Sequence, residues 1–214
     1  MESFTSITGT AVPFMRINID TDQITPGPEI LRGRADGYRS SLFARWRYLD
    51  MDKRTPDPDF ILNREPWKHA AILLADRNFG CGSSRESAPQ ALRAFGFRSV
   101  IAPSFGGIFF SNSFRNGLLP VELPIEDVRH LADQVEASGG KARLTVDLEA
   151  QKVTGPDRET YVFRAPSVLR EMLLAGVDEI DLTLSRAAEI AAFRNQDQAE
   201  RPWAYRPRRA GQAH

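Results

Sequence analysis

Cysteine is nearly absent from this 214-residue sequence, in which Cys81 is the only one. A single cysteine excludes an internal disulfide and cannot supply the usual set of thiolates that holds an iron–sulfur cluster. We therefore expect this chain to bind no such cluster by itself. Cys81 could also be a nucleophile with His69 or His130 as its base, but no local pattern of a known cysteine enzyme surrounds it.

The sequence also lacks an excess of charge and a long apolar run. Lys and Arg number 28, as do Asp and Glu, so the net charge is zero and gives no argument for a nucleic-acid or membrane partner. No apolar stretch approaches the roughly 20 residues of a transmembrane helix. Residues 1–18 show no signal-peptide pattern, and we expect a cytoplasmic protein.

What the sequence does contain is a glycine loop that follows an apolar run. The run Ala70–Ala75 is typical of a strand buried on both faces, and Asn78–Leu92 after it reads NFGCGSSRESAPQAL. Gly80 and Gly82 allow a sharp turn before a helix. The free amides of a helix start attract an anion, and the guanidinium of Arg85 adds a planar fork for a carboxylate or phosphate. The stretch therefore predicts an anion site, although it matches neither a P-loop nor G-x-G-x-x-G.

The beginning of that helix has two interpretations. Ser83 and Glu86 have the spacing of a capping box, so part of the signal is explained by helix capping alone. Pro89 would then lie inside the helix and remove a hydrogen bond, which favours a separate turn before the helix proper. The sequence leaves this boundary open.

The remaining pattern predicts an α/β fold. A helix ending at Gly96 and a second buried strand at Ser99–Ala102 complete a parallel βαβ unit, whose two strand-end loops should face one crevice. Residues 27–41 are rich in glycine and arginine without sustained periodicity, which predicts a loop that governs substrate choice. Apolar periodicity stops near Asn195, so we expect one domain at residues 1–195 and a flexible tail at 196–214.

Further motifs occur in the order typical of one family and cover nearly the whole chain. They read NIDTDQI, LFARWRYLD, PDPDFILN, ILLADRNFGCGSSRE, VIAPSFGGIFFSNSFRNGLLPV, VDLEAQKV and IDLTL. With them the sequence resembles the small subunits of bacterial 3-isopropylmalate dehydratase, a family of the aconitase superfamily. The resemblance implies a single swivelling β/β/α domain of the aconitase C-terminal type. It also implies a heterodimer with a large subunit that carries a [4Fe-4S] cluster.

The resemblance implies a hydro-lyase that interconverts 2-isopropylmalate and 3-isopropylmalate in leucine biosynthesis. By similarity Ser83 is the catalytic base and Asp22 supports the site, while Ser84 and Arg85 bind a substrate carboxylate. From the residues alone, the two aspartates of NIDTDQI could equally well cap their own turn. The family also has a substrate-binding arginine shortly after the aspartate, for which this chain offers two candidates, Arg32 and Arg34.

The chain departs from the family pattern at a few positions. The usual R-E-H-A-P-W is replaced at Ser87 and Gln90, and the basic residue expected after the proline of the first motif is replaced by Gly27 and Pro28. These departures bear on the substrate more than on the reaction class. Two alternatives follow: a related hydro-lyase subunit acting on citraconate and 2-methylmalate or another substituted malate, and a carboxylate-binding subunit without catalysis.

Overall fold

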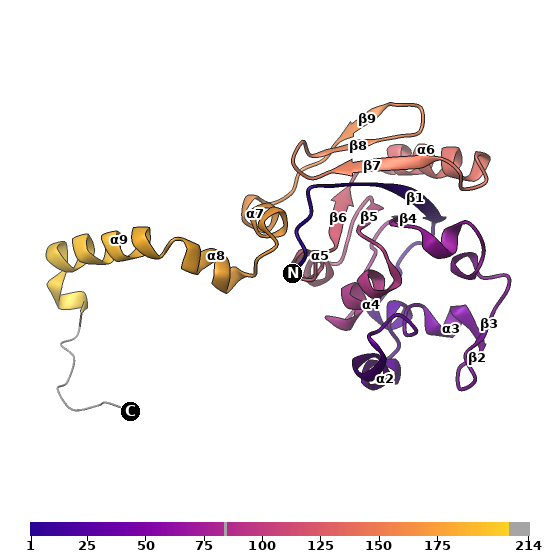
Figure 1. Cartoon of the computed structure of the whole chain (residues 1–214), viewed down its shortest axis with the longest axis horizontal. Helices are drawn as coiled ribbons and strands as arrows, with labels where there is room; N and C mark the ends of the chain where they lie inside the picture. The colour runs from indigo at the N-terminus through magenta and orange to yellow at the C-terminus, as the bar shows by residue number, and fades with distance from the viewer. Residues whose placement is uncertain (84, 206–214) are drawn as a thin grey trace. The chain divides into compact units, whose positions relative to one another are not determined.

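A computed structural model describes residues 1–83 and 85–205 of the chain (Figure 1). The chain divides into two compact units, Met1–Gly176 and Val177–His214. The division expected from the sequence, with a domain at 1–195 and a tail at 196–214, stays a prediction.

The first unit is built on a seven-stranded sheet with the order β6-β5-β4-β1-β7-β8-β9 (Figure 1). Its strands are β1 (Ser6–Phe14), β4 (Ile72–Ala75), β5 (Ser99–Ala102), β6 (Leu119–Glu122), β7 (Arg143–Asp147), β8 (Lys152–Thr154) and β9 (Thr160–Val162). A separate pair is formed by β2 (Tyr48–Asp50) and β3 (Thr55–Pro56). The α/β class expected from the sequence is confirmed.

Strand β1 joins a parallel half of the sheet to an antiparallel half. Its second part, Ala11–Phe14, pairs in parallel with β4, and β4, β5 and β6 continue that parallel ladder. Its first part, Ser6–Thr10, pairs antiparallel with β7, which leads into the meander of β8 and β9. One nine-residue strand therefore changes partners along its length.

Helices cover both faces of the sheet. The first unit contains α1 (Thr21–Ile24), α2 (Glu29–Asp36), α3 (Ala44–Arg47), α4 (Ser87–Phe95), α5 (Gly107–Arg115), α6 (Ile125–Ala137) and α7 (Ser167–Ala175), with short 3-10 turns η1 (Ile61–Asn63) and η2 (Trp67–His69). Successive side chains of a strand point to opposite faces. Thus Leu73 of β4 packs in the core that contains α4, and Leu74 packs in the core that contains α6 (Figure 1). All four residues of β4 are buried, as the apolar run predicted.

The helix after the glycine loop begins later than a cap at Ser83 would place it. Helix α4 starts at Ser87, with Glu86 at its N-cap and no side-chain capping bond, so the capping box is not formed. Pro89 consequently lies in the first turn, where its missing N–H group costs no helical hydrogen bond. Gly96 ends the helix as predicted. Of the two interpretations of the helix start, the structure therefore has the one with a separate segment before the helix.

The prediction of an irregular loop at residues 27–41 is wrong, because this segment contains α2. Gly37 has φ of +78° and its N–H donates to the carbonyl of Gly33, which ends the helix in a left-handed cap. A Cβ on Gly33 would lie 2.2 Å from the ring of Tyr38. These glycines serve helix termination and close packing, which composition alone does not distinguish from flexibility.

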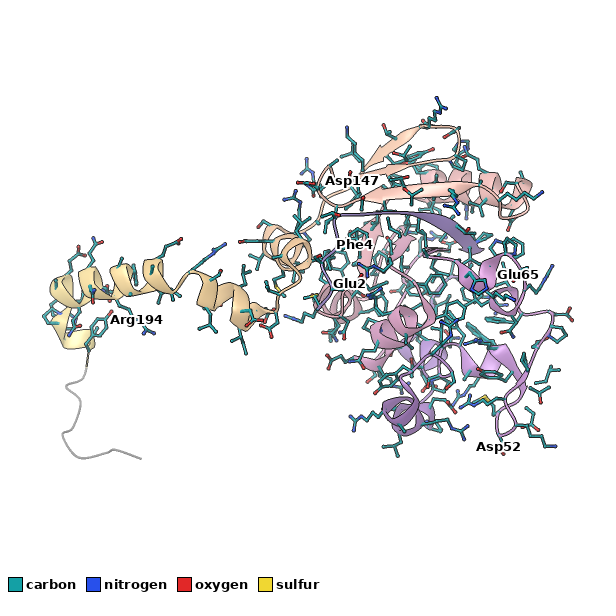
Figure 2. The ribbon with its side chains drawn as sticks, viewed as in Figure 1. Glu2, Phe4, Asp52, Glu65, Asp147 and Arg194 are labelled. Atoms are coloured by element: carbon teal, nitrogen blue, oxygen red, sulfur yellow. The ribbon has the colours of Figure 1, made fainter. Side chains whose placement is uncertain are left out.

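The N-terminal residues are fixed to the first unit. Phe4 is 1% exposed, and its N–H donates to the carbonyl of Leu173 over 2.9 Å. Glu2, which is labelled with Phe4 in Figure 2, forms ion pairs with Arg93 at 3.1 Å and with Arg98. The residues that precede β1 are thus held by packing and by charge.

The second unit contains the helices α8 (Glu179–Ser185) and α9 (Ala187–Glu200) and the turn η3 (Pro202–Ala204). Helix α9 begins two residues after the end of α8 and continues to Glu200. No described residue from 177 to 205 is buried. In the part of the chain that the structure describes, no helix is both long and apolar enough to cross a membrane.

Candidate functional site

The glycine loop lies against the segment that contains Asp20 and Asp22. The N–H of Gly80 donates to the carbonyl of Ile19 at 2.7 Å, and the N–H of Thr21 donates to the carbonyl of Cys81 at 3.0 Å. Gly80 has φ of +71°, and a Cβ there would lie 2.2 Å from the ring of Phe109. Only glycine fits this position, so the close packing of the glycine loop against Phe109 of α5 depends on it.

The second strand-end loop lies beside the glycine loop, as the βαβ pattern predicted. The N–H of Phe79 donates to the carbonyl of Ser104 at 3.0 Å, and the N–H of Gly106 donates back to the carbonyl of Phe79 at 2.9 Å. Both loops follow the carboxyl ends of parallel strands, β4 and β5. The site is therefore assembled at the end of the sheet where open α/β folds bind ligands.

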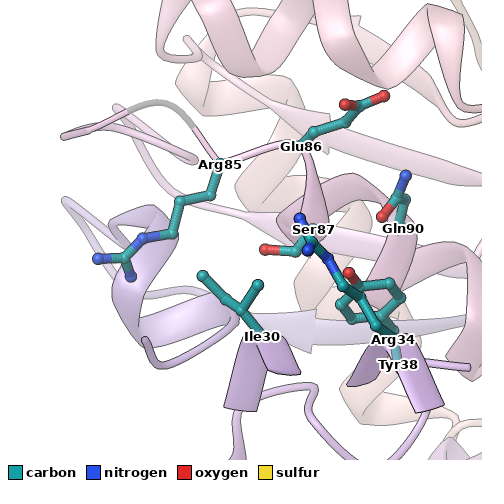
Figure 3. Close-up of a pocket in the computed structure, with 7 residues that line it drawn as sticks. All are labelled: Ile30, Arg34, Tyr38, Arg85, Glu86, Ser87 and Gln90. Atoms are coloured by element: carbon teal, nitrogen blue, oxygen red, sulfur yellow. The ribbon is translucent and has the colours of Figure 1, made fainter. Parts of the chain in front are cut away.

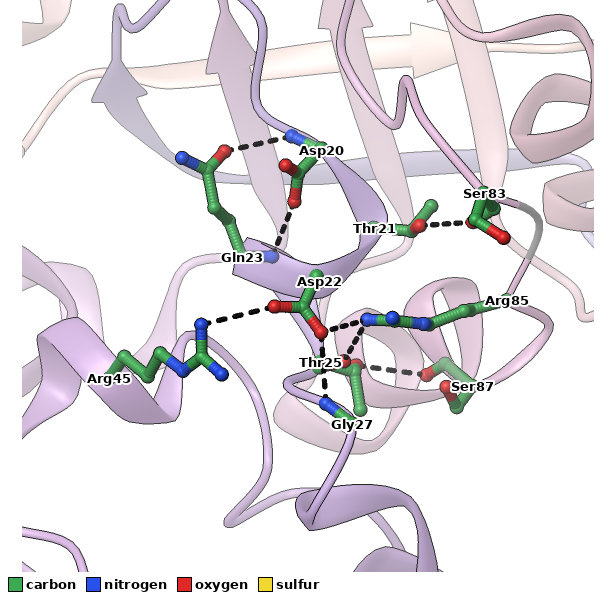
Figure 4. A network of polar contacts seen from close by, with 10 residues as sticks. All are labelled: Asp20, Thr21, Asp22, Gln23, Thr25, Gly27, Arg45, Ser83, Arg85 and Ser87. Atoms are coloured by element: carbon green, nitrogen blue, oxygen red, sulfur yellow. Dashed lines mark hydrogen bonds and ion pairs between the residues drawn. The ribbon is translucent and has the colours of Figure 1, made fainter.

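The two aspartates of the first motif have separate tasks (Figure 4). The carboxylate of Asp20 accepts the N–H of Gln23 at 2.7 Å, and the side chain of Gln23 accepts the N–H of Asp20 at 2.9 Å, a complete capping box at the start of α1. Asp22 faces the glycine loop and ion-pairs with Arg85. The capping role that the sequence allowed for this motif is thus filled by Asp20, and the role of Asp22 in supporting a site stays a prediction.

The carboxylate of Asp22 is the centre of a polar network (Figure 4). It accepts Arg85 on Oδ1, the N–H of Gly27 on the same oxygen at 3.0 Å, and Arg45 on Oδ2 at 3.1 Å. Arg85 also donates to the carbonyl of Thr25 at 3.3 Å. The hydrogen bond from Arg85 lowers the pKa of Asp22 below 3.8, against the opposing effect of partial burial. Asp22 therefore stays ionised and holds the guanidinium in place.

The remaining residues between the loop and α4 are positioned by threonine hydroxyls. The hydroxyl of Thr21 donates to the carbonyl of Ser83, and the hydroxyl of Thr25 donates to the carbonyl of Ser87 at 3.3 Å (Figure 4). Ser83 itself is exposed. Ser84, expected to bind substrate, lies outside the described residues. Three expected site residues, Asp22, Ser83 and Arg85, thus meet around α1.

A cavity of about 510 Å³ opens between α2 and the first turn of α4 (Figure 3). It is lined by Ile30, Arg34, Tyr38, Arg85, Glu86, Ser87 and Gln90. Ligand pockets commonly have volumes of about 300–1,000 Å³. Both candidate arginines are exposed, but Arg34 is among the residues that line this cavity and Arg32 is not.

The geometry gives no support to Cys81 as a nucleophile. Burial raises the pKa of the Cys81 thiol, and the charge of Asp20 raises it further. A raised pKa keeps the thiol protonated and weakly reactive. Both suggested bases have other neighbours: His69 lies 3.9 Å from Glu65, and His130 lies 3.3 Å from Asp157.

Arg45 was not foreseen as a site residue. Its guanidinium reaches Asp22 from α3, and its side chain is 58% exposed. The signal that could have found it is the motif LFARWRYLD, which places arginines soon after the aspartate motif. The roles of Thr21 and Thr25 in positioning the loop were also not predicted, because a side-chain hydrogen bond to a distant backbone carbonyl has no characteristic sequence spacing.

Comparisons with known proteins agree with the geometry. Residues 1–126 match the family of the aconitase C-terminal domain, and residues 129–164 match the family described as LeuD_N. The 3-isopropylmalate dehydratase small subunit of Cupriavidus necator is 50% identical over 203 residues, which cover 95% of this chain and 98% of that protein. The crystal structure of 3-isopropylmalate dehydratase (LeuD) from Methanocaldococcus jannaschii aligns with a TM-score of 0.60 and 27% identity, covering 87% of this chain and 98% of that chain.

Proposed function

Because the chain belongs to the family of 3-isopropylmalate dehydratase small subunits, we propose that it interconverts 2-isopropylmalate and 3-isopropylmalate as one part of a two-subunit hydro-lyase. The role is in leucine biosynthesis, and a cytoplasmic location accords with such a biosynthetic step. The reaction removes a proton from one carbon and a hydroxide from its neighbour. Water is then returned to the double bond in the opposite orientation.

The partner is a large subunit, which together with this chain forms a heterodimer. Family resemblance assigns a [4Fe-4S] cluster to that subunit, where an open iron site assists hydroxide departure as a Lewis acid. The residues of this chain do not fit such a cluster, since Cys81 is its only cysteine and its thiol pKa is raised. What this chain contributes is the binding of the carboxylates and the movement of the proton.

Proton removal next to a carboxylate places new negative charge on an already anionic group. A fixed cation near that group lowers the barrier more than it stabilises the ground state. Arg85 is suited to this task because Asp22 and the carbonyl of Thr25 hold its guanidinium from one side. In the proposal Arg85 and Ser84 bind one carboxylate of the substrate, and Ser83 accepts the proton.

Arg34 is proposed to bind the substrate as well, in preference to Arg32. It lies on the cavity-facing side of α2, four residues after Ile30, so the two side chains share one face of the helix. The segment at 27–41, although helical, therefore still reaches the site through Ile30 and Arg34. We therefore still expect this segment to influence which alkyl malate the enzyme accepts.

The observation that carries the proposal is the ion pair between Asp22 and Arg85, which joins the first motif to the glycine loop. The test is reconstitution with the large subunit, followed by turnover measurements with isopropylmalates, citraconate and homocitrate-type acids. Preferred turnover of the isopropylmalates supports the proposal. Preference for citraconate or 2-methylmalate would indicate the related hydro-lyase, and a stable complex that converts no acid would indicate a non-catalytic carboxylate-binding subunit.

A further inference from the structure

Ser87 has a buried hydroxyl that the fold leaves without a partner. The residue is 6% exposed, and its Oγ makes no hydrogen bond within residues 1–83 and 85–205. Its backbone carbonyl is occupied by the hydroxyl of Thr25. A buried hydroxyl without a hydrogen bond destabilises the protein in which it lies, so a serine here calls for a reason other than stability.

The surroundings of Ser87 point to a ligand. Ser87 lines the cavity between α2 and α4, and Gln90 lines it from the same face of α4, three residues later. Arg34 enters from α2, and no hydrogen bond or ion pair joins its guanidinium to the described residues. Figure 3 shows the side chains of Ser87 and Arg34 among those that line the cavity, with that of Glu86 extending away from them.

These groups are complementary to a carboxylate. A guanidinium, a hydroxyl and an amide NH₂ group can all donate to carboxylate oxygens, and charge-assisted bonds of this kind are the stronger ones. Arg85 also lines this cavity, while its guanidinium belongs to the Asp22 network. A malate-type acid has two carboxylates, so a second polar subsite beside Arg85 would bind the one that Arg85 does not.

We propose that the Ser87 hydroxyl, together with Gln90 and Arg34, binds the second carboxylate of the dicarboxylate substrate. This inference rests on the proposed function and adds Ser87 and Gln90 to its binding residues. Ligand binding supplies the hydrogen bond that the Ser87 hydroxyl lacks in the free chain. The position therefore exchanges some stability of the free chain for affinity.

The test is Ser87→Ala in the complex with the large subunit. We expect KM for 3-isopropylmalate to rise about tenfold or more with kcat changed less than about threefold, because a bond made equally in ground and transition states affects binding alone. Calorimetric Kd for 3-isopropylmalate should rise by the same factor. The melting temperature of the free variant should equal or exceed that of the wild type, since the unpaired hydroxyl is gone.

Ser40→Ala is the matched control. Its Oγ is also buried and without a partner among the described residues, but Ser40 does not line the cavity. This variant should leave KM and Kd unchanged. Gln90→Glu is a second variant, in which a carboxylate replaces the amide and should weaken binding through like charge.

The outcomes separate this inference from the proposed function. A Ser87→Ala complex with wild-type KM and Kd would overturn the subsite. A wild-type complex that binds the acid without converting it would contradict the proposed function. In that case the Kd of the Ser87→Ala complex alone would decide the subsite: a raised Kd would support it, and a wild-type Kd would overturn it.

Discussion

Asp22 and Arg85 are 63 residues apart in the sequence and form an ion pair in the structure. The pair joins α1 to the segment after the glycine loop and fixes one side of the guanidinium. Arg45 engages the other oxygen of the same carboxylate at 3.1 Å. The orientation of the proposed carboxylate-binding arginine thus depends on an aspartate that need not touch the substrate.

Replacing Asp22 with asparagine should therefore impair catalysis without removing a substrate contact. We expect kcat/KM of the reconstituted enzyme to fall about 10- to 100-fold, because a misplaced binding group costs rate steeply. Steady-state kinetics with 3-isopropylmalate provide the measurement. Asp20→Asn is the control, since asparagine also caps a helix and Asp20 faces Gln23. Equal losses in the two variants would contradict a special role for Asp22.

The same pair should give a pH-dependent difference in stability. The hydrogen bond from Arg85 lowers the pKa of Asp22 from 3.8. A carboxyl with a lowered folded-state pKa stabilises the protein fully above its unfolded value and loses that effect as pH falls through the folded value. Wild type should thus melt higher than Asp22→Asn at pH 7, and the gap should close on acidification below 3.8. A gap that widens in acid would show the pKa to be shifted the other way.

Ser83 and Arg85 should affect different kinetic constants. Ser83→Ala should lower kcat by about 10² to 10⁴, the range for a lost general base, with KM changed little. Arg85→Lys should also raise KM, because a point charge cannot reproduce a two-pronged contact. The assay uses the reconstituted pair with cluster content checked by absorbance. If Ser83→Ala keeps most of its turnover, the base is another residue.

The purified chain should bind no iron–sulfur cluster and should have no dehydratase activity alone. One cysteine cannot hold a cluster, and the hydroxide-leaving step is assigned to the partner. Activity should appear only when a cluster-bearing large subunit is added, at a rate that saturates with that subunit. Turnover by the isolated chain would overturn the two-subunit arrangement.

Removing the C-terminal residues should leave the first unit folded. No described residue from 177 to 205 is buried, so little apolar surface is lost when this part is deleted. Chains ending after Asn195 and after Gly176 should both melt within about 2 °C of the full chain. A large drop in melting temperature for either would show that the deleted part is packed.

Local patterns predicted the local features well. Strand β5 was placed at Ser99–Ala102 from its apolar run, and Gly96 was identified as the helix end. Residues 27–41 were mistaken for a loop because Gly33 and Gly37 lower helix propensity, and the packing of Tyr38 that compensates is visible only in three dimensions.

The site was predictable only in part, for a related reason. The motifs nominated Asp22, Ser83 and Arg85, but no spacing rule could show that Asp22 pairs with Arg85 and that the Asp20 side chain caps α1. The choice between Arg32 and Arg34 depended on which face of α2 meets α4. A serine whose hydroxyl lacks a partner cannot be recognised before its neighbours are known, which is why Ser87 was noted only as a departure.

The change of partners along β1 has a consequence for how the chain is made. β1 leaves the ribosome before both of its partners, which are β4 at residues 72–75 and β7 at residues 143–147. At about 5–20 residues per second, β7 follows β1 by roughly 7 to 27 seconds. During that interval a nine-residue strand at the middle of the future sheet has an unpaired edge. The nascent chain is then most exposed to wrong pairing, and protection by a chaperone would matter more for it than for the finished protein.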